Sequence, residues 1–472
     1  MIQSALLTDL YQLTMLAGYF EKQMHQSPAV FDLFFREAPF QGNFAIFAGL
    51  GTALEQLEQL RFSQEELAYL DSLGLFKPSF LDFLSEFRFR GQILAPAEGS
   101  VVFAHEPLLT VEASLAEAQL VETLLLNTIN FQTLVATKAA RIKLAAGNGE
   151  VIEFGLRRAQ GPDGGLSVAR AACIGGVQTT SNVLAGMTFG IPVRGTHAHS
   201  WVMAFEDELT AFRAYAEVFP DSCVLLVDTF DTLESGLPNA LTVARELREQ
   251  GHELKGIRLD SGDLAYLSKR ARELFDAAGF PGVRIVASNE LDEHLIHSMR
   301  SEGARIDIYG VGTRLATCAG PGGGALGGVY KLVQLDHQPK LKLTSDLAKA
   351  TLPGRKRLWR AIDPQGRLVM DILALEQEQP HPGDLVYDPT NPSRCIRIPA
   401  EVRLTDLRKP VMAEGHFTAS DTSLGQMAEH CASQLQALPQ GSLRLINPHR
   451  YKVSMSAGLH QLRQQLIADL SR

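Results

Sequence analysis

The sequence predicts an α/β protein whose central part is an irregular (β/α) barrel, with an α+β N-terminal domain and a smaller C-terminal portion. Between about residues 149 and 335, short apolar runs alternate with helical patterns, and repeated βα units of this length form a parallel sheet. Polar, glycine-bearing clusters follow nearly every run. Catalytic groups in a barrel gather from many strand ends, whereas a doubly wound sheet concentrates them at one switch point. The distribution favours the barrel, with the doubly wound sheet as the alternative.

The length of 472 residues allows two or three domains. Changes in pattern place the boundaries near residues 145 and 340, which gives domains of residues 1–145, 146–340 and 341–472. Hydrophobic residues at 45% and charged residues at 21% are typical of a soluble globular protein. The net charge of −9 argues against a general nucleic-acid-binding surface.

Targeting signals and cysteine usage point to the cytoplasm. The first residues carry no charged region before an apolar core, so we expect no secretory signal. No apolar run approaches the ~18 residues that span a bilayer, so we expect no membrane segment. The five cysteines lie far apart and form no C-x-x-C pair, which fits a reducing compartment and gives no zinc signature.

The first domain combines helical and strand patterns. Residues 8–15 predict an amphipathic helix with Thr8 or Asp9 near its N-cap. Residues 31–35 and parts of 93–111 carry strand signals, and residues 116–146 carry a long helical pattern. This mixture predicts an α+β domain.

The second domain repeats one unit, a short strand followed by a helix. Strands are predicted at residues 150–154, 192–196, 222–228, 256–260, 283–288, 306–309 and 329–333. Helices are predicted at residues 167–187, 201–219, 237–250, 265–278 and 291–301. In the third domain, residues 340–360 look basic and loop-like, and residues 423–438 and 456–471 carry helical patterns.

The segment from Arg194 to Ser200 connects a predicted strand to a predicted helix. Its polar residues therefore lie at the carboxyl edge of a strand, where the next helix offers free backbone N–H groups to an anion. Either His197 or His199 is a candidate nucleophile or acid/base group. Taken alone, the segment favours histidines of a solvated loop.

Three further strand ends carry charged or glycine-rich clusters. Arg258 and Asp260 share one face of their strand, because side chains alternate with a period of two. An arginine suits a carboxylate or phosphate and an aspartate suits ribose hydroxyls or magnesium, although an internal salt bridge is the alternative. Residues 310–313 fit a phosphate cradle or a tight turn, and residues 154–165 fit an anion site or a solvated loop.

These clusters, taken in order, resemble the nicotinate phosphoribosyltransferase family along nearly the whole chain. The matching stretches are residues 8–15, 154–165, 195–200, 258–263, 310–313 and 447–449. The resemblance implies the irregular barrel of the type II phosphoribosyltransferases. It also implies a ligase-classed reaction in the salvage route to NAD, in which nicotinate and 5-phosphoribosyl 1-diphosphate give nicotinate mononucleotide and pyrophosphate. ATP is the implied co-substrate, Mg²⁺ the implied cofactor and a homodimer the implied assembly.

The resemblance also assigns roles to individual residues. The second histidine of the family motif is phosphorylated by ATP and corresponds to His199, whereas His197 falls on a variable position. The nicotinate site corresponds to Tyr11, Phe154, Arg157, Thr196, Ser200 and Arg258, with Tyr11 supplied by the neighbouring subunit. The phosphoribosyl diphosphate site corresponds to Asp260, Ser261, Gly310, Gly312 and Thr313. Asp260 is the second implied catalytic residue, because it can stabilise positive charge that develops on the ribose.

Other activities remain open at the level of sequence. Nicotinamide phosphoribosyltransferase is similar, and the uncharged Asn182 at the position aligned with its ring-binding aspartate favours a carboxylate substrate. Quinolinate phosphoribosyltransferases are shorter and lack the histidine motif. A catalytically silent barrel that binds NAD metabolites is the alternative from another class, against which His199, Asp260 and Thr313 count.

Overall fold

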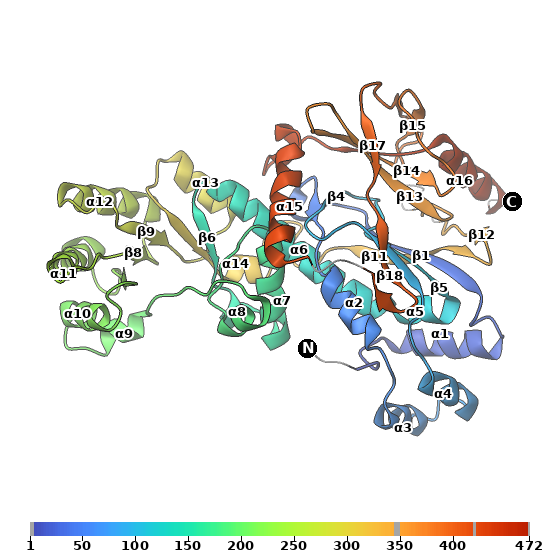
Figure 1. Cartoon of the computed structure of the whole chain (residues 1–472), viewed down its shortest axis with the longest axis horizontal. Helices are drawn as coiled ribbons and strands as arrows, with labels where there is room; N and C mark the ends of the chain where they lie inside the picture. The colour runs from blue at the N-terminus through green and yellow to red at the C-terminus, as the bar shows by residue number, and fades with distance from the viewer. Residues whose placement is uncertain (1–3, 344–349, 419–421, 471–472) are drawn as a thin grey trace. The chain divides into compact units, whose positions relative to one another are not determined.

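A computed structural model describes residues 4–343, 350–418 and 422–470. The chain divides into two compact units (Figure 1), one made of residues 1–137 and 321–472 and the other of residues 138–320. The structure confirms a mixed α/β protein with a parallel sheet. Within the sequence predictions, residues 1–3, the middle of segment 340–360 and residue 471 fall outside the described residues. The division into three domains stays a prediction.

The second unit is built on a parallel sheet. Its strands, in spatial order, are β6 (Glu150–Glu153), β10 (Ile308–Val311), β9 (Arg284–Ala287), β8 (Gly256–Leu259) and β7 (Val224–Leu226). Its helices are α7 (Gly161–Ile174), α8 (Val183–Phe189), α9 (His199–Met203), α10 (Glu208–Val218), α11 (Leu237–Glu249), α12 (Leu264–Ala277), α13 (Glu293–Ser301) and α14 (Thr313–Ala316), together with the C-terminal end of α6 (Glu122–Ala146). The strands are almost wholly buried and apolar, as parallel strands covered on both faces must be. Asp263 and Asp292 cap α12 and α13 just beyond β8 and β9, so each strand end passes directly into a helix.

The structure does not confirm the predicted barrel. Beyond β6 the described residues add only two isolated parallel bridges, Glu153 with Thr180 and Thr180 with Val193. The predicted strand 192–196 is thereby reduced to a single paired residue, because Pro192 has no N–H to donate. The predicted strand 329–333 lies elsewhere, as part of β11 (Gly328–Leu335), which pairs antiparallel with β1 (Pro28–Phe35) in the other unit.

Two predicted helices are each divided in two. The pattern at residues 167–187 becomes α7 and α8, because α7 ends at two glycines and Gly176 adopts a φ of 97°. The pattern at residues 201–219 becomes α9 and α10, and Asp207 starts α10 by accepting a hydrogen bond from the N–H of Thr210. The first break places Thr180 beside β6, where it forms an isolated bridge with Glu153.

The first unit contains two large sheets. The seven-stranded sheet has the order β12 (Gln338–Pro339), β11, β1, β5 (Leu109–Ser114), β3 (Gln92–Ala95), β18 (Lys409–Ala413) and β19 (His416–Phe417), and a small sheet pairs β2 (Ala45–Ile46) with β4 (Val101–Val102). The six-stranded sheet has the order β16 (Cys395–Arg397), β15 (Leu385–Tyr387), β20 (Lys452–Met455), β14 (Leu368–Leu375), β13 (Lys356–Ile362) and β17 (Arg403–Asp406). Its helices are α1 (Leu10–Glu21), α2 (Leu50–Glu58), α3 (Gln64–Ser72), α4 (Pro78–Ser85), α5 (Leu115–Leu120), the first part of α6, α15 (Leu424–Ala437) and α16 (Ala457–Leu470). Strand β13 corrects the loop-like interpretation of residues 356–360.

A buried ion pair joins β13 to β14 in this unit. The guanidinium of Arg360 donates to both carboxylate oxygens of Asp371, to Gln434 and to the carbonyl of Val101. Both partners of the pair are at most 1% exposed. Because all three nitrogens of the Arg360 guanidinium donate hydrogen bonds, the pair satisfies the main condition for a stable buried charge.

We predict that Arg360→Met destabilises the protein by about 3–5 kcal/mol, because Asp371 would remain as an uncompensated buried charge. Urea titration followed by circular dichroism measures this loss. Arg357→Met is the matched control on the same strand, because Arg357 is exposed, and it should change stability by no more than about 0.5 kcal/mol. Equal effects of the two variants would contradict the assignment.

Candidate active site

Two groups from different segments of the second unit meet at the carboxyl edge of the parallel sheet. His199 begins α9, and its Nε2 lies 3.2 Å from Oδ1 of Asp228, two residues beyond the end of β7. The imidazole is 41% exposed, whereas the carboxylate is 1% exposed. The structure therefore presents a reachable histidine whose orientation is set by a buried carboxylate.

Asp228 also organises the end of the neighbouring strand. Its second oxygen, Oδ2, accepts hydrogen bonds from the backbone N–H of Asp260 at 2.8 Å and from the hydroxyl of Ser261 at 2.7 Å. Asp228 thus joins the end of β7, the loop after β8 and the start of α9. The sequence analysis did not assign a role to Asp228, although its position at the end of a predicted strand was the available signal.

The guanidinium of Arg258 lies among the predicted site residues Thr196, Asp260 and Phe154. It donates to Ser288 Oγ at 2.8 Å, to Thr196 Oγ1 at 3.3 Å and to Asp260 Oδ1 at 2.7 Å. Its central carbon also lies 5.8 Å from the centre of the Phe154 ring. The salt bridge considered from the sequence is therefore present, and it forms within the same cluster as the predicted nicotinate-binding residues.

The carboxylate of Asp260 is held in its charged form. Burial alone would raise its pKa, but the hydrogen bond from Ser288 and the nearby Arg258 together lower the pKa below its usual value. Both interactions use Oδ1. In the described part of the chain, Oδ2 accepts no hydrogen bond, so this oxygen is available to a ligand.

The ring of Phe154, the residue after β6, lies against Gly310 of β10. A Cβ on Gly310 would lie 2.5 Å from the Phe154 ring, so only glycine allows the ring to keep this position. Gly312 precedes α14, whose first residue is Thr313. The hydroxyl of Thr313 donates to Glu290 Oε1 at 2.8 Å, so a carboxylate lies beside the predicted phosphate cradle.

The loop that carries Glu290 has an uncommon backbone. Asn289 and Glu290, just after β9, have φ values of 89° and 38°. Positive φ values at non-glycine residues cost about 1–3 kcal/mol and cluster at functional sites. This loop is therefore a further component of the site. The sequence placed it among the polar clusters that follow predicted strands, but gave its residues no role.

The remaining predicted residues lie at different places. Arg157, on a single 3₁₀ turn after β6, and Ser200, in the first turn of α9, are exposed. Tyr11 is 48% exposed at the start of α1, in the unit that does not contain the other site residues. It lines a hollow of about 360 Å³ between the first turn of α1, α6 and residues 324–326.

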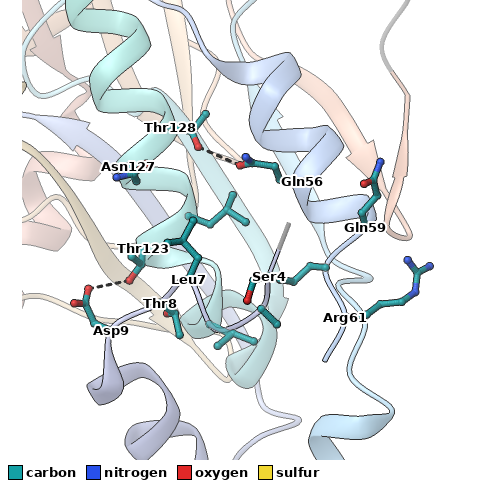
Figure 2. Close-up of a pocket in the computed structure, with 14 residues that line it drawn as sticks. Ser4, Leu7, Thr8, Asp9, Gln56, Gln59, Arg61, Thr123, Asn127 and Thr128 are labelled. Carbon is teal, nitrogen blue, oxygen red and sulfur yellow. Dashed lines mark hydrogen bonds between the residues drawn. The ribbon is translucent and has the colours of Figure 1, made fainter. Parts of the chain in front are cut away.

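A second hollow of the first unit, of about 390 Å³, lies between residues 4–9, the end of α2 and α6 (Figure 2). Hydrogen bonds from Thr123 to Asp9 and from Thr128 to Gln56 cross its wall. Its lining includes none of the residues that the sequence predicts for catalysis or substrate binding.

Asn182 has a local structural role. Its Oδ1 caps α8 by accepting from the N–H of Ala185 at 3.2 Å, and its Nδ2 donates to the carbonyl of Gly165 at 3.4 Å. Both ends of the amide are therefore engaged within the protein, and the residue is buried.

Among the described residues, no group of three or more histidine, cysteine, aspartate or glutamate side chains is placed to hold a metal ion. Mg²⁺ commonly uses only one or two carboxylates together with substrate phosphates, and the unpartnered Oδ2 of Asp260 fits that donor set. No helix in the described ranges is both long and apolar enough to cross a membrane.

Comparison with known proteins gives consistent matches over most of the chain. Residues 6–130 match the nicotinate phosphoribosyltransferase N-terminal domain model, residues 150–323 the family model and residues 355–463 the C-terminal domain model. The Bacillus subtilis nicotinate phosphoribosyltransferase is 42% identical over 471 residues, covering 98% of this chain and 95% of that protein. The human nicotinate phosphoribosyltransferase is 36% identical over 530 residues, covering 99% and 97%.

Solved structures agree with these matches. The crystal structure of human nicotinic acid phosphoribosyltransferase superposes with a TM-score of 0.87 at 34% identity, covering 97% of this chain and 99% of that chain. The crystal structure of nicotinate-nucleotide pyrophosphorylase from Pyrococcus furiosus has a TM-score of 0.71 at 22% identity, covering 91% and 94%. The second likeness indicates a shared fold.

We predict that Ser288→Ala raises the pKa of Asp260 and destabilises the protein by about 1 kcal/mol at pH 7. The lowered pKa of Asp260 contributes stability that is present above its unfolded value and lost as pH falls through the folded value. The stability difference between variant and native protein should therefore shrink below about pH 4. Denaturant titrations at several pH values measure it, with Ser298→Ala as the exposed-serine control; a difference independent of pH would contradict the prediction.

Proposed function

Because this chain belongs to the nicotinate phosphoribosyltransferase family, we propose that it performs the ATP-coupled form of that reaction through a phosphorylated His199. Nicotinate and 5-phosphoribosyl 1-diphosphate give nicotinate mononucleotide and pyrophosphate, while ATP gives ADP and phosphate. The observation that carries the proposal is the accessible His199 imidazole held by the buried Asp228. The product enters NAD salvage. The five free cysteines support a reducing, cytoplasmic setting.

The contact with Asp228 selects the reactive nitrogen of His199. A carboxylate beside Nε2 favours the tautomer with a proton on that nitrogen, which leaves the lone pair on Nδ1. Nδ1 attacks the γ-phosphorus of ATP, the bond from that phosphorus to the β,γ-bridging oxygen breaks, and ADP leaves. Water later cleaves the phosphorus–nitrogen bond and releases phosphate. Asp228 stabilises the positive imidazolium that forms in the first step.

Arg258, Thr196 and Phe154 together support nicotinate as the substrate. The guanidinium of Arg258 and the hydroxyl of Thr196 lie 3.3 Å apart and are both donors that suit a carboxylate. The Phe154 ring beside them offers an apolar face to the pyridine ring. A neutral amide would gain much less from the cation, so we assign selectivity for the acid to this group, with Arg157 and Ser200 at the exposed side.

Asp260 and Ser261 would hold the ribose. As the diphosphate departs from C1, positive charge develops on the sugar, and the charged Asp260 stabilises it. The pyridine nitrogen then forms the new bond to C1, and no general base is needed. Mg²⁺, when bound, would neutralise the leaving diphosphate, and Oδ2 of Asp260 is the available protein ligand for it.

Gly310, Gly312 and Thr313 would hold the 5-phosphate of the substrate. The phosphate would replace Glu290 as the partner of the Thr313 hydroxyl. The strained backbone of Glu290 supports such an exchange, because releasing that residue relieves part of the strain. We also propose that the parallel sheet belongs to the irregular type II phosphoribosyltransferase barrel, whose strand ends share one mouth.

A homodimer would complete the site by supplying Tyr11 of the partner subunit to the pyridine ring. Each unit exposes apolar side chains that a second copy can cover. These are Leu7, Leu10 and Tyr11 in the first unit, and Val183, Leu184 and Met187 in the second, each 48% to 78% exposed. Clustered exposed apolar residues of this kind mark interaction surfaces.

We predict mononucleotide formation from nicotinate, with a kcat/KM that ATP raises about 5–150-fold, the usual range for coupled sites. The measurement offers the purified protein phosphoribosyl diphosphate, Mg²⁺ and either nicotinate or nicotinamide, with and without ATP, and follows mononucleotide and ADP. His199→Ala should retain only the ATP-independent rate and form no phosphoenzyme. A preference for nicotinamide would overturn the substrate, and unchanged ATP stimulation in His199→Ala would overturn the phosphohistidine.

A second prediction concerns Tyr11. Co-expressed Tyr11→Ala and His199→Ala chains, purified as mixed dimers through two different tags, should recover about half of the native ATP-coupled activity, because one of the two sites is intact. Each variant alone should show almost none. If Tyr11 acts within its own chain, mixed dimers stay as inactive as the parents, and size-exclusion chromatography confirms that dimers formed.

A further inference from the structure

His197 is buried beside the exposed His199 and makes contacts of its own. It is 7% exposed, and its ring packs edge-on against Tyr215 of α10 with a centroid distance of 4.7 Å. Its Nδ1 lies 3.4 Å from the carbonyl of Ala198, and its Nε2 accepts the backbone N–H of Leu226 at 3.2 Å. Both ring nitrogens are therefore engaged in a way that requires one proton, on Nδ1.

The backbone N–H of Leu226 points away from β8 and needs another acceptor. The next N–H, that of Val227 just past the end of β7, donates to the carbonyl of Arg258 in β8. Successive N–H groups of an extended strand point to opposite sides, so the N–H of Leu226 faces the edge of β7 that has no strand beside it. Leu226 is fully buried, and a buried N–H without an acceptor is costly.

The same segment is held at the other edge of the sheet. Thr180 pairs with Val193 on one side and with Glu153 of β6 on the other, and its hydroxyl donates to the Glu153 carboxylate at 2.6 Å. The segment that carries His199 is therefore connected to β6 through the backbone bridges of Thr180 and to β7 through the hydrogen bond of His197. These two connections link the first and last strands of the parallel sheet.

We propose that His197 is a positioning residue, whose neutral imidazole takes the place of a missing strand hydrogen bond and fixes the segment of His199 against β7 and Asp228. The proposal rests on the proposed function for its effect on ATP coupling, but not for the contact itself. Asp228 lies two residues beyond Leu226 in the same extended run. A fixed distance between Leu226 and the ring of His197 therefore also limits the distance between Asp228 and His199.

The surroundings of His197 keep the ring neutral. Burial lowers its pKa, and the nearby positive charge of Arg258 and the imidazole of His199 lower it further, so that the pKa lies at about 4 despite the Ala198 carbonyl. Tyr215, from α10, is the other titratable group against the ring. Because the pKa of His197 is lowered in the folded protein, the hydrogen bond from Leu226 to its Nε2 is fully present above the ordinary value of 6.5. This hydrogen bond is lost as pH falls toward 4.

The test compares His197→Leu, which fills the space without an acceptor, with His197→Gln, whose amide oxygen can still accept the N–H of Leu226. In His197→Leu, hydrogen exchange of the Leu226 amide should accelerate at least about tenfold. The ATP-stimulated kcat should fall about 10²-fold, as for a misplacement near 1 Å. His197→Gln should restore both the protection and the ATP-stimulated kcat.

His252→Leu is the matched control, because His252 pairs with Asp221 on the surface of the same unit; it should change neither readout.

A second measurement uses the native protein, without any substitution. The ¹⁵N chemical shifts of His197 should show a proton on Nδ1 only and no titration above about pH 5. Equal exchange of the Leu226 amide in native protein and His197→Leu, or titration near 6.5, would overturn the proposal. Absence of ATP stimulation in the native protein would instead overturn the proposed function and leave the exchange result as the deciding test.

Discussion

The buried carboxylate of Asp228 is the constraint on which the site depends. It accepts hydrogen bonds from the N–H of Asp260 and from Ser261, and it contacts His199 through its other oxygen. A carboxylate that is 1% exposed is stable only when its oxygens are satisfied in this way. Its three partners come from two other segments of the second unit, so satisfying Asp228 also sets the positions of the histidine and of the loop after β8 relative to each other.

The parallel sheet explains why one carboxylate can do this. Strands β7 and β8 run side by side in register, with Leu226 opposite Arg258, so the residues that follow them emerge at the same edge. Asp228 and Asp260 each lie just past that register, and Ser288 follows β9 in the same way. The site therefore consists of groups that can position a substrate and offer it charged partners. That composition suits a displacement at C1 of a ribose, for which no base has to remove a proton.

Local patterns predicted this part of the structure well, because strand ends can be located from short apolar runs and the alternation of side chains places Arg258 and Asp260 together. Longer-range features left no such signal. Strand β11 pairs with β1, nearly 300 positions away, and β18 pairs with β3, and such pairings depend on complementary surfaces rather than on local propensity. The six-stranded sheet was missed for a related reason: strands such as Cys395–Arg397 are short and largely exposed. The partners of Asp228 and Thr180 arise only when separate segments meet.

His197 and His199 show how environment separates two identical side chains in one short segment. Side chains two residues apart can face opposite ways, and here one ring enters the packed layer beneath α10 while the other stays 41% exposed. The buried ring lies near Arg258 and accepts a backbone N–H, so it is held neutral as an acceptor. The exposed ring contacts a carboxylate, which favours a proton on Nε2 and leaves Nδ1 open. A motif that treats the first histidine as variable describes only its lack of chemistry toward the substrate. The ring of His197 nevertheless accepts the N–H of Leu226, which has no strand partner, and the position of His199 depends on that hydrogen bond.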